Sequence, residues 1–99
     1  MFRFHHISLS VSNADKSAGF YSVFGFKKVF EWVADDGSLR IVHLKLSDSL
    51  MELFCFKEPV RAPASMRDLE TDLPVIGVRH FGLKTDSIVE ARDALVRLG

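Results

Sequence analysis

The chain has 99 residues, enough for one domain, and its 13 basic and 13 acidic side chains give a formal net charge of zero. No block of basic residues stands out and no apolar run approaches the length of a membrane span, so neither nucleic acid nor membrane is an expected partner. A single cysteine cannot form an internal disulfide, and this favours a cytoplasmic protein.

The first predicted elements are a strand and a helix. In "FHHISLSVSN", residues 4–13, apolar residues alternate with polar ones, and His6 leads the polar face. Asn13 is suited to cap the helix that follows. Apolar residues then recur at helical spacing up to Gly25, which fits the C′ position where helices commonly stop.

Three further strands are expected after the helix. Residues 26–34 are rich in aromatic and β-branched residues, and residues 38–46 and 50–56 are also strongly apolar. Asp36-Gly37 is typical of a hairpin turn, and residues 47–49 turn the chain again. The pattern therefore predicts an α+β fold, with a βαβββ module over residues 1–56.

Residues 78–99 repeat the opening of the chain. His80-Phe81-Gly82-Leu83 resembles His6-Ile7-Ser8-Leu9 at an offset of 74 residues, and a helical pattern ending at Gly99 follows. We expect the first strand and helix of a second, incomplete module here. Residues 57–77 contain all three prolines and are interpreted as a linker with a helical turn near residues 66–70.

The second module has no room for its remaining three strands, which at the same offset would end near residue 130. We therefore expect a fragment, a natural truncation, or a chain that borrows its complement from a partner. An unfinished sheet exposes strand edges, and such edges invite pairing with another chain.

Glu52 is the candidate functional residue within "LMELFCF", residues 50–56. Alternation places Glu52 and Phe54 on one face and Met51 and Leu53 on the other. A carboxylate in so apolar a strand is costly unless it is paired or bound to a cation. One interpretation pairs it with Arg40. The other combines it with His6 and His80, because two imidazoles and a carboxylate suit Zn, Ni, Fe, Co or Mn.

Several other side chains have weaker interpretations. We expect Trp32 in the core and Phe54 beside a substrate pocket. Arg40 and Lys84 are candidate contacts for an anionic group, with Arg40 taken as a substrate-binding residue. His43, between two apolar residues of a strand, is interpreted as a surface histidine or as a neighbour of the site.

The segment "HISLSVSNADKSAGFYSVFGF", together with "MELF" and "RHFGLKTDSIVEARDALVRLG", resembles the vicinal oxygen chelate superfamily, which includes glyoxalase I, bleomycin-resistance proteins and extradiol dioxygenases. The resemblance implies paired βαβββ modules that enclose a divalent metal. It also implies that His6, Glu52 and His80 correspond to three metal ligands, with Glu52 as a possible catalytic base. The fourth ligand, a glutamate expected near residue 126, lies beyond this sequence.

The resemblance favours a metal-dependent lyase or isomerase, similar to lactoylglutathione lyase, that acts on a small oxygenated substrate by proton transfer through an enediolate. The alternative is a metal-free small-molecule or drug-binding protein of the bleomycin-resistance type. Because modules of this family work in pairs, we also expect a homodimer with exchanged modules, in which His80 is donated by the partner.

Overall fold

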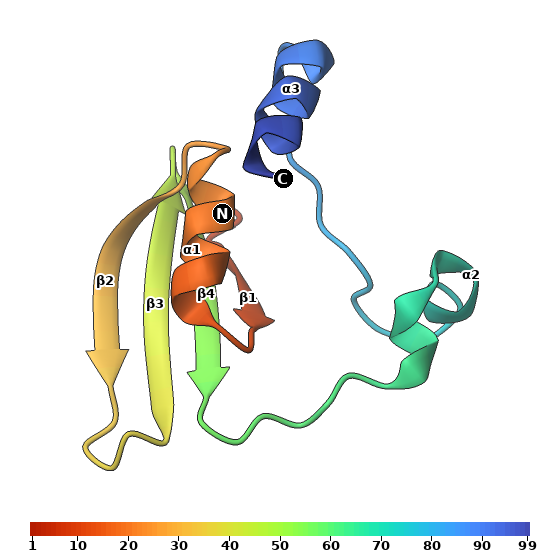
Figure 1. Ribbon diagram of the computed structural model, residues 1–99. Helices are drawn as coiled ribbons and strands as arrows, with labels where there is room; N and C mark the ends of the chain where they lie inside the picture. The colour runs from red at the N-terminus through yellow and green to blue at the C-terminus, as the bar shows by residue number, and fades with distance from the viewer.

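The computed structural model describes residues 1–99, and a four-stranded sheet with one helix packed against it forms the body of the protein (Figure 1). The strands lie in the order β1-β4-β3-β2, with β1 parallel to β4 and the other neighbours antiparallel. This βαβββ arrangement confirms the predicted α+β module. Its elements are β1 (His6–Ser10), α1 (Ala14–Ser22), β2 (Lys27–Val33), β3 (Leu39–Leu46) and β4 (Ser49–Phe56).

Both ends of α1 follow from local sequence chemistry. The Asn13 side chain accepts a hydrogen bond of 3.0 Å from the backbone N–H of Lys16, which satisfies a donor that the first helical turn leaves free. Gly25 follows with a φ of 99°, a left-handed conformation that glycine adopts without strain. A Cβ at this position would approach Leu46 Cδ1 to 3.2 Å, so the turn is also too tight for a larger residue.

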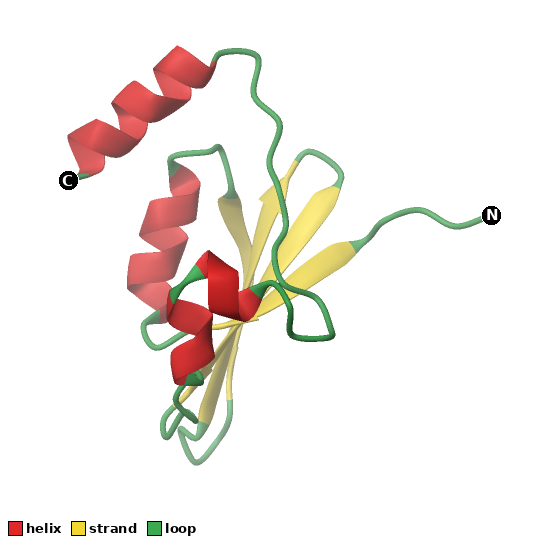
Figure 2. Ribbon diagram, turned by 90° about the vertical axis from the view of Figure 1, so that its right-hand side faces the viewer, coloured by secondary structure: helices red, strands yellow, loops and turns green.

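The core lies between α1 and one face of the sheet, and Figure 2 shows the helix on one side of the strands only. Strand alternation supplies most of it, because every second residue of β3 and β4 points towards the helix. The buried core residues are Ala14, Phe26, Val42, Leu44, Met51 and Leu53.

After β4 the chain extends away from this body, and its last part returns beside the end of α1 (Figure 1). It contains two short turns, the 3₁₀ helix η1 (Ala64–Arg67) and α2 (Leu69–Asp72), and then α3 (Ile88–Leu98). Ser87 caps α3 by accepting a hydrogen bond from the Glu90 backbone N–H. The helical turn expected in the linker and the second helix are therefore present, whereas the division into residues 1–56, 57–77 and 78–99 stays a prediction.

The strand predicted at His80 is wrong for the single chain, because the structure has no strand between β4 and α3. An extended segment becomes a strand only when a neighbouring strand pairs with its backbone groups, and none does so here. Phe81 instead packs beside Tyr21 of α1, with the two ring centres 6.4 Å apart. No helix of the protein combines the length and apolar character needed to cross a membrane.

Candidate functional site

The face of the sheet opposite α1, called here the open face, carries the polar residues singled out in the sequence. Cross-strand pairing sets Ser8 of β1 and His43 of β3 on either side of Glu52, and His6 stands at the near end of β1. Directly paired residues point to the same side of a sheet, so these four side chains share the open face. Alternation along β4 had predicted this orientation for Glu52.

Glu52 is held by two hydrogen bonds. Ser8 Oγ donates to Oε1 at 3.0 Å, and His43 Nε2 lies 2.8 Å from Oε2. The ionised carboxylate only accepts hydrogen bonds, so the His43 nitrogen must be the donor. Hydrogen bonding to His43 lowers the pKa of the Glu52 carboxyl below its ordinary value, with smaller contributions from Ser8 and the nearby charge of His6, against the opposing effect of burial. Glu52 is therefore an anion fixed in one orientation.

The three predicted metal ligands do not meet within one chain. His6 faces the same side as Glu52, and its Nδ1 lies 2.8 Å from Nδ1 of His5. His80 is exposed and adjoins Phe81, which packs beside α1 on the other side of the sheet. Nowhere in the chain do three His, Cys, Asp or Glu side chains form a group able to hold a metal ion. A single copy therefore does not fit a metal centre.

Arg40 lies on the helix-covered side and contacts neither Glu52 nor the open face. Its guanidinium donates to Asp15 in the first turn of α1 at 2.9 Å and also to Glu31 of β2. These contacts dock the start of α1 onto the sheet. They give no support to a substrate-binding role for Arg40, which stays a prediction. The sequence-based pairing of Arg40 with Glu52 is wrong, because His43 takes that place.

The apolar side chains beside the site come from three neighbouring strands, and two of them are aromatic. Trp32 pairs with Ile41, which pairs in turn with Phe54, so the three lie in one row across the open face. Trp32 is 47% exposed, and its assignment to the core was wrong. Phe54 borders a hollow that residues 59–62 also line, and its expected place beside a substrate stays a prediction.

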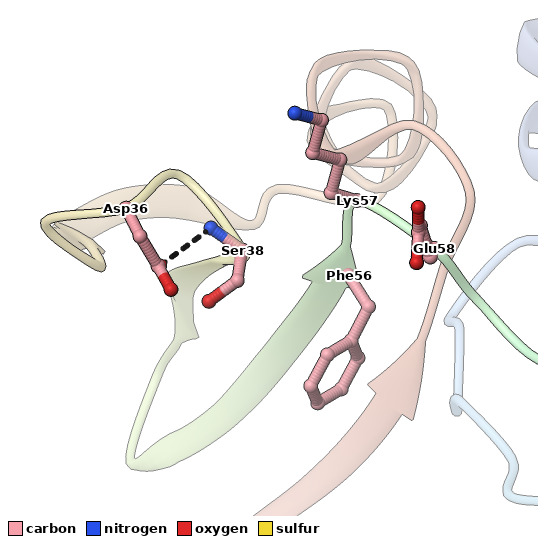
Figure 3. A pocket seen from close by; sticks show the side chains of 5 residues that line it. All are labelled: Asp36, Ser38, Phe56, Lys57 and Glu58. Atoms are coloured by element: carbon pink, nitrogen blue, oxygen red, sulfur yellow. Dashed lines mark hydrogen bonds between the residues drawn. The ribbon is translucent and has the colours of Figure 1, made fainter.

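A second hollow opens where the β2–β3 hairpin meets the end of β4 (Figure 3). Asp36 accepts a hydrogen bond of 3.0 Å from the Ser38 backbone N–H there, and the Phe56 ring lies below Lys57 and Glu58. None of its lining residues is a candidate ligand, so this hollow is separate from the Glu52 site.

Comparison with known proteins agrees with this architecture. The sequence model described as Glyoxalase/Bleomycin resistance protein/Dioxygenase superfamily matches residues 3–99. The chain belongs to this superfamily. A solved structure designated SMU.1112c is 26% identical, with a TM-score of 0.74 over 99% of this chain and 75% of that one. The glyoxalase family protein from Enterococcus faecalis is 22% identical, with a TM-score of 0.71 over 96% of this chain and 71% of that one. No curated protein matches.

Membership of the glyoxalase superfamily fixes the fold and leaves the chemistry to be argued from the site. What the chain itself offers is an ionised carboxylate between a hydroxyl and an imidazole, with aromatic side chains on the neighbouring row. Sequence reasoning missed the Ser8 contact. Its polar alternation with His6 was visible, but the β1–β4 register that sets it against Glu52 was not.

Proposed function

We propose that the open face binds a small oxygenated molecule and that two copies of the chain together form a metal-dependent lyase or isomerase of the glyoxalase type. The placement of Glu52 carries this proposal. It is an ionised carboxylate on the uncovered face of the sheet, oriented by Ser8 and His43 and lying on the same face as His6. A carboxylate with only a structural role would lie at the edge of the sheet, where keeping it ionised costs less free energy.

In this proposal Glu52 accepts and returns the substrate proton. Its low pKa keeps the carboxyl ionised and able to accept at neutral pH. The His43 hydrogen bond fixes Oε2, which prevents the carboxylate from rotating away from the substrate. The aromatic side chains of the neighbouring row would pack against the substrate's remaining groups.

The metal of the proposed site would be held by His6 and Glu52 of one copy and by His80 of a second copy. Bound there, a divalent ion of Zn, Ni, Fe, Co or Mn would stabilise the negative charge that develops on substrate oxygen. The donor types suit these ions, although one chain alone does not assemble them.

Exposed apolar surface in the second unit supports the paired arrangement. Leu83 is 43% exposed, Ile88 is 75% exposed, and the segment before α3 has no strand partner. The free side of β1 is likewise unpaired, because β1 ends the sheet. Burying a large apolar side chain contributes roughly 1.5–3 kcal/mol, so exchange of second units between two copies would recover substantial stability. This exchange is the homodimer expected from the sequence.

Mixing two inactive variants tests the shared site. Glu52→Gln and His80→Gln should each abolish metal binding, measured by elemental analysis after purification without added metal. In a mixed dimer one of the two sites keeps all three ligands, so co-expression should restore about a quarter of the wild-type metal content by random pairing. Glu58→Gln, the same change at an exposed carboxylate away from the Glu52 site, is the matched control and should keep its metal.

Any of three results would refute the proposal. The first is stoichiometric metal in both single variants. The second is a wild-type monomer that retains metal in sedimentation at micromolar concentration. The third is a mixture that shows no restored metal binding although both variants are folded, which would exclude a metal site shared between two chains.

The alternative, a metal-free binding protein of the bleomycin-resistance type, is favoured by the aromatic side chains of the open face. Phe30, Trp32 and Phe56 are each 45–49% exposed on that side, enough for a flat molecule to stack against them. Protein purified with no bound metal that also takes up none on titration would select this alternative.

A further inference from the structure

Along its strands the open face changes from apolar to polar to basic, and the proposed role of Glu52 does not involve the basic end. The row of Trp32, Ile41 and Phe54 is apolar, and the next row contains His43 and Glu52. One row further, at the end near the β3–β4 turn, two cations face the same side. A face that passes from aromatic to polar to basic matches a ligand with the complementary order of groups.

The basic end consists of Lys27 and Lys45, which are direct partners in the β2–β3 pairing. Both are exposed, and neither ammonium group has an ion-pair partner. Asp48 in the adjacent turn forms no ion pair with them either. Like charges directly opposite one another destabilise an antiparallel pair, so an anion between the two lysines would remove an unfavourable contact.

The third lysine of β2 and β3 shows the contrast. Lys28 points to the helix-covered side, where its Nζ lies 3.0 Å from Glu31. The cations on that side are thus neutralised within the chain, and those on the open face are not. This asymmetry places the uncompensated positive charge on the same surface as Glu52.

The dimensions limit the ligand. Ile41 and Lys45 are four residues apart on β3, which at a rise of 3.3–3.4 Å per residue separates the apolar and basic rows by about 13 Å. Lysine side chains can lean inwards by several ångströms, so a molecule somewhat shorter than this reaches both ends. Glu52 then lies beside its middle.

We propose that the open face selects an elongated small molecule with an aromatic or alkyl group over Trp32 and Phe54 and a carboxylate or phosphate between Lys27 and Lys45. The inference rests on the proposed function, in that the oxygenated group undergoing reaction lies at Glu52. It adds the substrate class, an amphiphilic organic anion, which neither the fold nor the superfamily specifies.

Trp32 is the only tryptophan of the chain, so its fluorescence reports on this face alone. The probes are 6-phenylhexanoate and 6-phenylhexanamide, which share ring and chain and differ in charge. We expect the carboxylate to bind about 3- to 10-fold more tightly than the amide at low salt, as expected for two partly exposed ion pairs. The preference should shrink at 0.5 M NaCl, where such pairs are screened.

The double variant Lys27→Gln/Lys45→Gln should bind both probes equally. The control Lys16→Gln/Arg97→Gln removes the same charge from the two helices and should keep the preference. Equal binding of the two probes by the wild type would overturn the proposal. Loss of the carboxylate preference in the control variant would also overturn it. So would Trp32 fluorescence that neither probe changes, because a second copy would then cover the open face.

Metal titration of the same proteins separates the two proposals. Lost metal binding in Glu52→Gln should leave the carboxylate preference intact. Wild-type protein that binds no metal yet prefers the carboxylate would refute the proposed enzyme and support the inferred ligand class.

Discussion

Leucine-to-alanine substitutions on the two faces of β4 test which face of the sheet carries Glu52. Leu53 is fully buried, and Leu50 is only partly buried on the open face. Leu53→Ala should lower the free energy of unfolding by about 2–5 kcal/mol, since it removes buried methyl groups and leaves a cavity. Leu50→Ala should cost roughly 1 kcal/mol, because much less of its surface is withdrawn from water.

Urea unfolding followed by circular dichroism measures both losses. With a slope of about 1–3 kcal/mol per molar urea, a loss near 3 kcal/mol moves the midpoint down by about 1–3 M. Both variants are compared with the wild type at one protein concentration, because association would make the midpoint depend on it. An equal or larger loss in Leu50→Ala would show that the strand faces the other way. Glu52 would then lie under α1, and the proposed site would fail.

Two further predictions concern the ion pair that attaches α1 to the sheet and the residue that caps its N-terminus. The Arg40 ion pair lowers the pKa of Asp15 below its ordinary 3.8, so its stabilisation is present above that pH and is lost as pH falls through the lower folded pKa. Arg40→Gln should therefore destabilise the protein at pH 6 and much less at pH 2.5, and a constant difference in thermal midpoint would contradict this. Asn13→Ala should cost about 0.5–2 kcal/mol in urea unfolding and Asn13→Ser clearly less; equal losses would mean that the cap contributes nothing.

The elements of the first module could be predicted because their signals are local. The cap at Asn13, the stop at Gly25 and the Asp36-Gly37 turn each act within a few residues, and the four strands predicted in this module lie close to their observed bounds. The orientation of Glu52 followed from alternation along one strand for the same reason.

The partners of Glu52 could not be predicted, because they depend on which strands become neighbours and in what register. Ser8 is 44 residues away along the chain, and His43 reaches Glu52 only through the β3–β4 pairing. Trp32 illustrates the same limit. A large aromatic residue suggests the core, but pairing with Ile41 and Phe54 fixes it on the open face.

His80 shows where a sequence pattern depends on assembly. Its segment has the alternation of a strand, yet a strand exists only beside another, and the single chain provides no neighbour for it. Phe81 is partly buried against Tyr21, and Leu83 and α3 keep much of their apolar surface exposed. The position of His80 therefore depends on what covers that surface. If a second copy does, metal binding and pairing of chains become one linked equilibrium, in which each strengthens the other.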